Sequence, residues 1–343
     1  MKLVILFFIA NYLIKDTSQQ ADRVDCYPDS SALFGASVEP RCLQRNCIFQ
    51  SSSTPNEPWC FFPQDTYGYT MTNSMKVTNG YVITLQRLTK YSQPFPEPID
   101  SLKFELKYLN NKVLHFKITD ATKSRYEVPI ELNDIEDQNL NENNSELEFI
   151  FENRSPDSVF VFKIRRRSTG VVIFDTSIGA FVFCEQFLQI VTRLPKNSNV
   201  YGFGENNHPS LSHDLNYKSW GIFARDQSTA GGENTNQYGA QPFYSVLEED
   251  GNAHGVMFLN SNAMEYEFSP IPALIMRSIG GVFDFYVFSG PEPESVTQQL
   301  TSLIGRPFMP PYFALGFQLA RWNYLDLDDM KRIVESNLAA GWF

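Results

Sequence analysis

Long hydrophobic runs are missing from the interior of this sequence. A helix that crosses a bilayer needs about 18 or more consecutive apolar residues, and no stretch after residue 14 approaches that length. Charge is also sparse: 20% of the residues are charged and 43% are hydrophobic, the composition of a globular protein and not of a disordered one. A chain of 343 residues leaves room for about two or three domains. We therefore expect a folded, soluble protein without an integral membrane span.

Positive charge is in deficit. Lys and Arg total 28 against 39 Asp and Glu, which gives a net charge of -11. Such a surface repels phosphate backbones. The one basic run, Arg165-Arg166-Arg167, lies in a strand-like stretch without interleaved aromatic residues. The sequence predicts no nucleic-acid partner.

Histidine is scarce as well. His208 and His213 are near each other in the sequence, but no third ligand stands with them, and His115 and His254 are scattered. A zinc site takes three or four protein ligands. We expect loop histidines, with no metal and no cofactor.

Of only five cysteines, four lie close together near the N-terminus: Cys26, Cys42, Cys47 and Cys60. This clustering is typical of disulfides in an exported protein, and four cysteines allow three pairings. Cys184 stands alone in a strand-like run without an activating partner. We expect it to be a small buried hydrophobe and not a nucleophile.

The N-terminus has the pattern of a signal peptide over residues 1–20. Lys2 precedes about twelve mostly apolar residues, and the cleavage point falls between Ser18 and Ala21. A membrane-anchored stalk is the alternative. The glycosylation acceptors Asn143 and Asn153 agree with export. We expect a secreted glycoprotein.

Three further regions follow the signal. Residues 24–68 carry the clustered cysteines and little hydrophobic periodicity, so this small module must be crosslinked. Residues 74–290 read as short strands separated by turns, which favours a β-sandwich. The clearest hairpin joins Leu102–Tyr108 to Leu114–Ile118 through Asn110-Asn111. Other strands are predicted at Tyr81–Leu85, Leu147–Phe151, Val159–Ile164, Val171–Phe174, Tyr244–Leu247, Gly255–Leu259 and Phe283–Phe288.

Residues 291–343 change to helical periodicity. A helix with Val296, Leu300, Leu303 and Ile304 on one face ends at Gly305. The continuous apolar run in Pro310–Ala320 predicts a strand buried on both sides.

A second helix is predicted from Asp326 to Ala340, with Leu327, Met330 and Leu338 turned inward. Its acids, Asp326, Asp328, Asp329 and Glu335, read as a solvated face that complements the helix dipole. Together the strand and this helix form one βα unit, the opening of an incomplete (β/α)8 barrel. The fold class is therefore mainly β: a small crosslinked module, a β-sandwich and the start of a barrel.

Ordered motifs carry a family resemblance. The segments Cys26-Tyr-Pro-Asp, Arg41-Cys-Leu-Gln-Arg-Asn-Cys47 and Pro58-Trp-Cys-Phe-Phe62 resemble a trefoil (P-type) module. The following segments resemble the galactose-mutarotase-like β-sandwich of glycoside hydrolase family 31: Val200-Tyr-Gly-Phe-Gly-Glu205, Arg225-Asp226, Gln237-Tyr-Gly-Ala-Gln241 and Gly280-Gly-Val-Phe-Asp-Phe-Tyr-Val-Phe288. The segment Ala314-Leu-Gly-Phe-Gln-Leu-Ala-Arg-Trp-Asn-Tyr324 is similar to the start of that family's barrel, in its maltase-glucoamylase and sucrase-isomaltase type.

The trefoil resemblance implies a disulfide pattern. A trefoil has six cysteines, bridged first to fifth, second to fourth and third to sixth. Here Ile48 stands where the fifth would be, and no cysteine precedes Cys26 after the signal. The resemblance therefore implies the bridges Cys26–Cys47 and Cys42–Cys60.

The family resemblance also implies an activity. Its members hydrolyse α-glucosidic bonds with retention, using two aspartates on later barrel strands, so we expect no catalytic residue here and an inactive chain. The implied partners are α-glucan oligosaccharides: maltose, isomaltose and malto-oligosaccharides, with α-1,4 and in part α-1,6 bonds. A non-catalytic secreted carbohydrate-binding protein is the alternative.

The resemblance also implies four sugar-contacting residues: Arg225, Asp226, nearby Ser228 and Trp322. A carboxylate accepts sugar hydroxyls, a guanidinium donates in a fixed fork, and an aromatic face packs on a pyranose ring. At the Trp322 position, Trp is found in isomaltase and lysosomal types and Tyr in maltase types, which favours tolerance of α-1,6 bonds. Without the resemblance, Arg225 and Asp226 read as a surface ion pair and Trp322 as a strand-end core residue.

Overall fold

The computed structural model describes residues 23–28, 38–64, 67–90, 94–140, 142–152, 157–228 and 235–342. The predicted signal peptide lies outside this part. The chain divides into two units, residues 1–304 and residues 305–343, and each is described by itself. No helix in the described ranges is both long and apolar enough to cross a bilayer.

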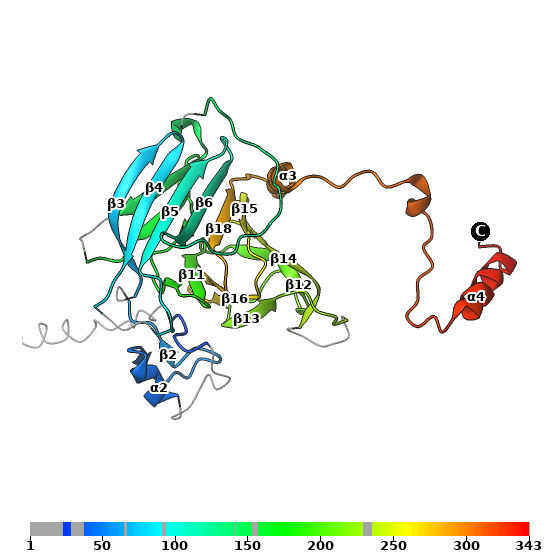
Figure 1. Cartoon of the computed structure of the whole chain (residues 1–343), viewed down its shortest axis with the longest axis horizontal. Coiled ribbons are helices and arrows are strands. Elements are labelled where there is room, and N and C mark those ends of the chain that lie inside the picture. Colours follow the sequence, from blue (N-terminus) through cyan, green and yellow to red (C-terminus); the bar gives the residue numbers. More distant parts are fainter. Residues whose placement is uncertain are drawn as a thin grey trace, which may run out of the picture. The chain divides into compact units, whose positions relative to one another are not determined.

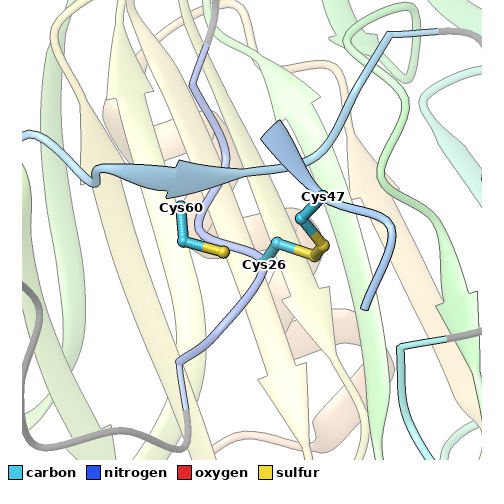
Figure 2. A group of neighbouring side chains, drawn as sticks. All are labelled: Cys26, Cys47 and Cys60. Atoms are coloured by element: carbon cyan, nitrogen blue, oxygen red, sulfur yellow. A yellow bond between two sulfur atoms is a disulfide. The ribbon is translucent and has the colours of Figure 1, made fainter. Parts of the chain in front are cut away.

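The N-terminal module has little regular structure. A short helix, α2 (Glu39–Gln44), precedes β1 (Ile48–Phe49) and β2 (Cys60–Phe61), which pair antiparallel. Disulfides join Cys26 to Cys47 and Cys42 to Cys60, with Cα separations of 6.4 and 5.6 Å. This is the pairing that the trefoil resemblance implies. Figure 2 shows Cys60 beside the Cys26–Cys47 bridge.

Eight antiparallel neighbours form the larger sheet of the sandwich, in the order β12-β14-β15-β18-β6-β5-β4-β3 (Figure 1). Its strands are β3 (Tyr69–Val77), β4 (Gly80–Arg87), β5 (Ser101–Tyr108), β6 (Val113–Asp120), β12 (Asn199–Asn206), β14 (Asn236–Leu247), β15 (Ala253–Phe258) and β18 (Phe283–Phe288).

A five-stranded sheet has the order β10-β11-β17-β16-β13, and a three-stranded sheet has the order β7-β8-β9. Their strands are β7 (Leu147–Glu152), β8 (Val161–Arg166), β9 (Val172–Asp175), β10 (Val182–Phe183), β11 (Leu188–Arg193), β13 (Lys218–Ile222), β16 (Met264–Ser269) and β17 (Ala273–Ser278). Buried side chains from all three sheets, such as Phe104, Phe162 and Phe268, belong to one hydrophobic core. The β-sandwich prediction is confirmed.

The predicted hairpin is also confirmed. β5 pairs with β6 in a register that sets Tyr108 opposite Leu114. Asn110 closes the turn, because its Oδ1 accepts from the backbone N–H groups of Lys112 and Val113 at 2.9 and 3.0 Å. Strict alternation buries Leu102, Phe104 and Leu106 and turns Lys103 and Lys107 outward.

The N-terminal module and the sandwich share a second core. Val24 and the four bridged cysteines pack in one cluster with Val182, Val191 and Ile275 of the five-stranded sheet. Cys184 belongs to this cluster as a free thiol that is 1% exposed, as the sequence predicts for a small hydrophobe. The module is therefore packed onto the sandwich instead of being held by its disulfides alone.

Helix α3 (Pro293–Ile304) ends the first unit. It buries Val296, Leu300 and Leu303 against the larger sheet, and Gly305 follows it with φ +92°. Three of the four residues of the predicted apolar face are buried, but the prediction for Ile304 is wrong, because its side chain is 48% exposed at the end of the helix. The predicted end is confirmed, since a left-handed residue terminates a helix at little cost when it is glycine.

The second unit departs from prediction at its first element. The predicted strand Pro310–Ala320 is wrong: Tyr312–Leu315 form a 3-10 helix (η3), and no residue from 305 to 342 is in a strand. A β-strand takes its hydrogen bonds from neighbouring strands, and none is present in this unit. The apolar side chains Phe313 and Leu315 are 79% and 63% exposed.

The helix of the second unit, α4 (Leu327–Ala339), follows its prediction in extent. Asp326 caps it by accepting from the N–H of Asp329 at 2.8 Å, and Gly341 follows with φ +77°. The prediction that Leu327, Met330 and Leu338 turn inward is wrong, because these side chains are about half exposed or more: 64%, 48% and 54%. An apolar helix face is buried only where a partner surface covers it.

Candidate functional site

The loop that follows β13 carries three of the predicted sugar-contacting residues. Arg225, Asp226 and Ser228 are all exposed, and residues 229–234 lie outside the described part. The N–H of Arg225 donates to the carbonyl oxygen of Gln237 at 3.0 Å, and the N–H of Gln227 donates to the carbonyl of Arg225 at 2.9 Å. The backbone of the loop is therefore hydrogen bonded to β14, while the Arg225 and Asp226 side chains face solvent.

A hydrogen-bonded clamp fixes the base of this loop. Nδ2 of Asn206, at the end of β12, donates to the carbonyl oxygen of Gly221 and to Oδ1 of Asn236, both at 2.9 Å. The hydroxyl of Tyr266 donates to Oδ1 of Asn206 at 3.0 Å. A side chain at Gly221 would collide with Asn236, since a Cβ there would lie 2.9 Å from Nδ2. β12, β13 and β14 are thus held together where the loop begins and ends.

Aromatic side chains pack around Tyr266, the residue that holds Asn206 in the clamp. Tyr266 stacks on Phe203 and on Trp220, with ring centroids 4.1 and 5.4 Å apart. His213 packs edge-on against Trp220, and its Nε2 lies 2.7 Å from the carbonyl oxygen of Gly202. This contact makes Nε2 the donor of a neutral ring.

The environment of His213 keeps its ring uncharged. Burial lowers the pKa of His213 to about 4, against a smaller opposing effect of the Gly202 hydrogen bond and with help from neighbouring His208. Both histidines lie in or beside the aromatic cluster, with rings 4.5 Å apart. His213 lies in the loop between β12 and β13, as the sequence predicted, and it is a buried packing residue there.

One group of possible metal ligands occurs in the described ranges, and its chemistry does not suit a metal. The Sγ atoms of Cys26, Cys47 and Cys60 lie within 4.8 Å of one another (Figure 2). Each of them is in a disulfide, so none offers the thiolate that binds metal.

Trp322 lies in the second unit, in the irregular segment between η3 and α4, and is 94% exposed. It is therefore not the strand-end core residue of the alternative reading. Its neighbour Arg321 pairs with Asp329 at 2.8 Å and lies over the ring of Tyr324. The structure describes Trp322 only within its own unit.

One acid of α4 departs from the prediction of a solvated face. Asp329 is 8% exposed and pairs with Arg321 and Arg332. The hydrogen bond from Arg332 is the main cause that lowers the pKa of Asp329. Asp328 stays exposed, as predicted.

The basic run of the sequence does not form a surface patch. Arg166 is 1% exposed: Nη1 pairs with Glu248, and the guanidinium also donates to the carbonyl oxygens of Ala253 and Ser289. Glu248 accepts a second hydrogen bond from Nδ1 of His254 at 2.7 Å. Although burial alone would raise it, these two partners lower the pKa of Glu248 to about 2. Arg166 is therefore a buried structural residue that neutralises Glu248 and hydrogen bonds two backbone carbonyl groups inside the sandwich.

Of the two glycosylation acceptors, Asn143 is exposed in the 3-10 turn Glu142–Asn144, and Asn153 lies outside the described residues. The sequence reasoning missed Asn206, Asn236 and Tyr266. Asn206 directly follows the Gly-Phe-Gly-Glu motif at 202–205, and Asn236 directly precedes the motif at 237–241, so both of these clamp residues flank segments that carry the family resemblance.

Comparison with known proteins agrees with this architecture. Residues 16–63 match the Trefoil (P-type) domain, and residues 103–267 match the Glycosyl hydrolase 31 N-terminal galactose mutarotase-like domain. The chain is 42% identical to intestinal sucrase-isomaltase of Homo sapiens over 322 residues, covering 93% of this chain and 17% of the relative. It is 39% identical to lysosomal alpha-glucosidase of Mus musculus over 322 residues, covering 92% of this chain and 32% of the relative.

A solved structure shares the fold at lower identity. The family 31 dextranase of Flavobacterium johnsoniae, in complex with isomaltotriose, superposes with a TM-score of 0.58 at 16% identity, over 81% of this chain and 33% of that one. The chain thus spans about a sixth to a third of the length of these relatives. From its trefoil match, its mutarotase-like domain match and its identity to these relatives over more than nine tenths of its length, the chain belongs to glycoside hydrolase family 31 and is homologous to the N-terminal region of α-glucosidases.

Proposed function

We propose that this chain is the N-terminal part of a secreted α-glucosidase that hydrolyses α-1,4-glucosidic bonds of malto-oligosaccharides, and α-1,6 bonds as a second linkage, with retention. The observation that carries the proposal is the 42% identity to intestinal sucrase-isomaltase over 93% of the chain. The dextranase of the same fold binds isomaltotriose, an oligosaccharide of glucose, which supports the substrate class.

In this proposal, the loop with Arg225, Asp226 and Ser228 contacts the sugar. An exposed carboxylate accepts hydrogen bonds from two sugar hydroxyls, and the neighbouring guanidinium donates to a third oxygen. The Asn206 clamp supports this role, because a loop whose ends are fixed loses less entropy when it binds. The nucleophile and the acid of a retaining glycosidase are two further carboxyl groups about 5–5.5 Å apart, and we assign neither to this chain.

Trp322 is the fourth proposed contact. Its indole is almost wholly exposed, so its face is available to stack on a pyranose ring. The signal-like N-terminus, the two disulfides and the exposed Asn143 support secretion and N-glycosylation.

The test is made on the protein encoded by the complete reading frame that contains this chain. We expect hydrolysis of maltose and, more slowly, of isomaltose, with the α-anomer of glucose appearing first by proton NMR. An Asp226→Asn variant loses a charged hydrogen bond, so kcat/KM on maltose falls about 10- to 100-fold. Trp322→Ala is expected to lower kcat/KM on isomaltose by about tenfold, a loss on the scale of one aromatic contact.

The matched control is Asp250→Asn, an exposed aspartate in the turn before β15, which is expected to keep wild-type kinetics. Release of the β-anomer, or an Asp226→Asn variant as active as the wild type, would contradict the proposal. Binding of maltose by calorimetry with no hydrolysis by the complete protein would favour a non-catalytic carbohydrate-binding protein instead.

A further inference from the structure

The contact between the trefoil domain and the five-stranded sheet, here called the joint, contains charged groups as well as apolar ones. Val24 and Cys60 of the trefoil belong there to one buried apolar cluster with Val182 and Ile275 of the sheet. Two residues before Cys60, the trefoil carbonyl of Pro58 accepts from Arg23, and Glu57 accepts from the hydroxyl of Tyr217 of the sandwich at 3.1 Å. The joint is thus a formed interface within the first unit.

Arg277 of β17 is the buried cation on the sandwich side. Its Nη1 lies 2.7 Å from a carboxylate oxygen of both Glu265 and Glu267 on β16, and its Nε donates to Oε1 of Gln189 at 2.7 Å. Nη2 is buried and has no hydrogen-bond partner among the described residues. Arg277 is 5% exposed, so its charge acts through a medium of low polarity.

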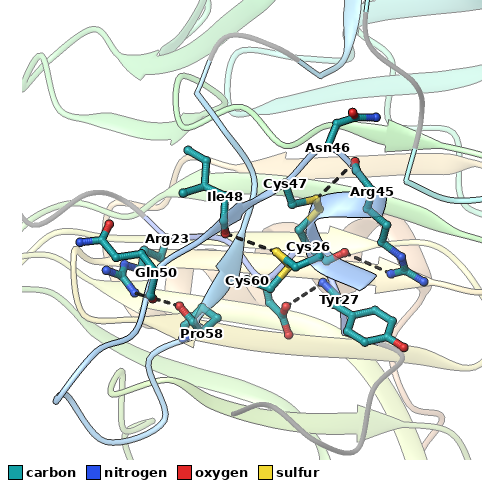
Figure 3. The surroundings of a disulfide bond; sticks show 12 residues. Arg23, Cys26, Tyr27, Arg45, Asn46, Cys47, Ile48, Gln50, Pro58 and Cys60 are labelled. Atoms are coloured by element: carbon teal, nitrogen blue, oxygen red, sulfur yellow. Dashed lines mark hydrogen bonds between the residues drawn. A yellow bond between two sulfur atoms is a disulfide. The ribbon is translucent and has the colours of Figure 1, made fainter. Parts of the chain in front are cut away.

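Asp25 is the buried acid on the trefoil side of the joint, between Val24 and Cys26, which both belong to the shared apolar cluster. It is 6% exposed, and its Oδ1 accepts from the N–H of Tyr27 at 2.8 Å. It lies close enough to Arg277, Glu265 and Glu267 for their charges to act on its carboxyl group. Figure 3 shows the trefoil side of this region, where Nη1 of Arg45 donates to the carbonyl oxygen of Cys26.

The joint has an excess of carboxyl groups. Asp25, Glu265 and Glu267 stand against the single guanidinium of Arg277. Glu265 relieves part of this excess because its side chain is 38% exposed, whereas that of Glu267 is 13% exposed. The nearby cation Arg23 pairs with Glu57 at 3.6 Å, and Arg41 donates to the Tyr27 hydroxyl. Keeping both Asp25 and Glu267 ionised in this poorly solvated region therefore leaves uncompensated negative charge.

Protonation of one carboxylate removes its negative charge and so reduces the excess of negative charge in the joint. Burial and then the charge of Glu267 raise the pKa of Asp25 to about 7, although Arg277 and the Tyr27 N–H act in the opposite direction. Burial also raises the pKa of Glu267.

We propose that the trefoil domain takes up a proton at Asp25 when it packs onto the sandwich, so that the joint is tightest in acid and opens more readily toward neutral pH. The opened joint returns Asp25 to water and to the ordinary acidity of an aspartate. Below about pH 4 both forms hold the proton, and above about pH 7 neither does. Between these limits the opening constant rises up to about tenfold per pH unit. This inference does not depend on the proposed glycosidase activity.

Cys184 is a built-in probe of the joint. It is the single cysteine outside the disulfides, it is buried, and it packs in the cluster that the trefoil covers. Its labelling by a maleimide is measured from pH 5 to pH 7.5 on the intact chain. The maleimide concentration is kept low, so that the joint opens and closes many times before a thiol reacts and the labelling rate is proportional to the opening constant. Each rate is divided by that of a cysteine in a short peptide at the same pH, which removes the titration of the thiol itself.

The normalised rate is expected to rise at least tenfold from pH 5 to pH 7 in the wild type. Asn has the shape of a protonated Asp, so Asp25→Asn is expected to label slowly and without pH dependence. Asp250→Asn, which changes a carboxylate outside the joint, is expected to keep the wild-type dependence. If Asp25→Asn does not fold, Glu267→Gln is used, and its pH dependence is expected to be weaker than that of the wild type.

Two results would overturn the inference. The first is a wild-type rate that is flat with pH, or variants of Asp25 or Glu267 that keep the full dependence. The second is hydrogen exchange in β5 and β6 that follows the same pH dependence as Cys184 labelling, since opening would then be global and not local to the joint.

Discussion

The side chains of Asn206 and Asn236 are hydrogen bonded at 2.9 Å across the base of the loop that carries Arg225 and Asp226. The same Asn206 amide holds the carbonyl oxygen of Gly221, so one side chain ties the end of β12 to both β13 and β14. The clamp rests on Tyr266 and hence on the core of the sandwich. The exposed loop is therefore tied to the sandwich core through the side chains of Asn206, Asn236 and Tyr266, and a point substitution can remove each of them separately.

Replacing Asn206 by Ala is expected to loosen this loop. The loss of a partly buried hydrogen-bond partner costs about 1–3 kcal/mol, or about 5- to 150-fold in the local opening constant. Hydrogen exchange of the Arg225 amide, which is bonded to Gln237, is expected to accelerate by that factor. The control Asn216→Ala removes an exposed asparagine that bonds only to neighbouring Asp214. Unchanged exchange at Arg225 in Asn206→Ala would contradict the clamp.

His213 is expected to make the fold sensitive to acid. Its pKa is lowered to about 4 in the folded protein, against an ordinary value of about 6.5. The contribution of the neutral ring is fully present above pH 6.5 and is lost as the pH falls from 6.5 to 4, up to about 3 kcal/mol. Asp25 acts in the opposite direction over much of this range, so the comparison must be made between variants.

The measurement for His213 is the urea unfolding free energy of the wild type minus that of His213→Gln at each pH. This difference is expected to shrink as the pH falls from 6.5 to 4. His208→Gln, at the neighbouring ring, serves as control and is expected to give a difference that changes little. A constant difference for His213→Gln would show that the ring does not titrate differently in the folded protein.

Glu248 is expected to be among the most sensitive positions of the sandwich. Glu248→Gln leaves Arg166 buried without its counter-charge, which costs about 3–5 kcal/mol in the free energy of unfolding. Glu249→Gln, at the exposed neighbouring position, is expected to change it by less than about 0.5 kcal/mol. Equal unfolding midpoints for the two variants in guanidinium chloride would rule out a buried ion pair.

Removing the bridge between Cys42 and Cys60 is expected to destabilise the trefoil. The double variant Cys42→Ser and Cys60→Ser opens a loop whose ends are 18 residues apart, worth about 3 kcal/mol in the chain-entropy model. Proteolysis within residues 38–64 is expected to quicken accordingly. Cys184→Ala, which removes a thiol but no crosslink, is the control, and equal proteolysis of both variants would contradict the prediction.

Local patterns were sufficient for much of the sandwich. Alternation in Leu102–Tyr108 and Leu114–Ile118 predicted both strands and their pairing, since one face of each strand is buried. The strand Leu188–Arg193 was not predicted, because five of its six residues are buried and no alternation marks it. The helix of residues 326–340 was predicted from its cap and its periodicity, which are local features.

The candidate site was predicted only in part. Arg225, Asp226 and Ser228 were found through motif resemblance and do lie in one exposed loop. Asn206 and Asn236 were missed because 30 residues separate them in the sequence. Their contact depends on the pairing of β12 with β14, which no local pattern specifies.

By itself, the sequence determined the disulfide-linked module, the strand-rich region, the two late helices and the net negative charge, because composition, spacing and periodicity act over short distances. Only the tertiary structure decided that Arg166 is buried on Glu248, that Asp25 is buried in the joint, and that residues 310–320 form no strand. Each of these outcomes depends on a partner far away in the chain: a charge is buried only where an opposite charge meets it, and a strand forms only beside another strand.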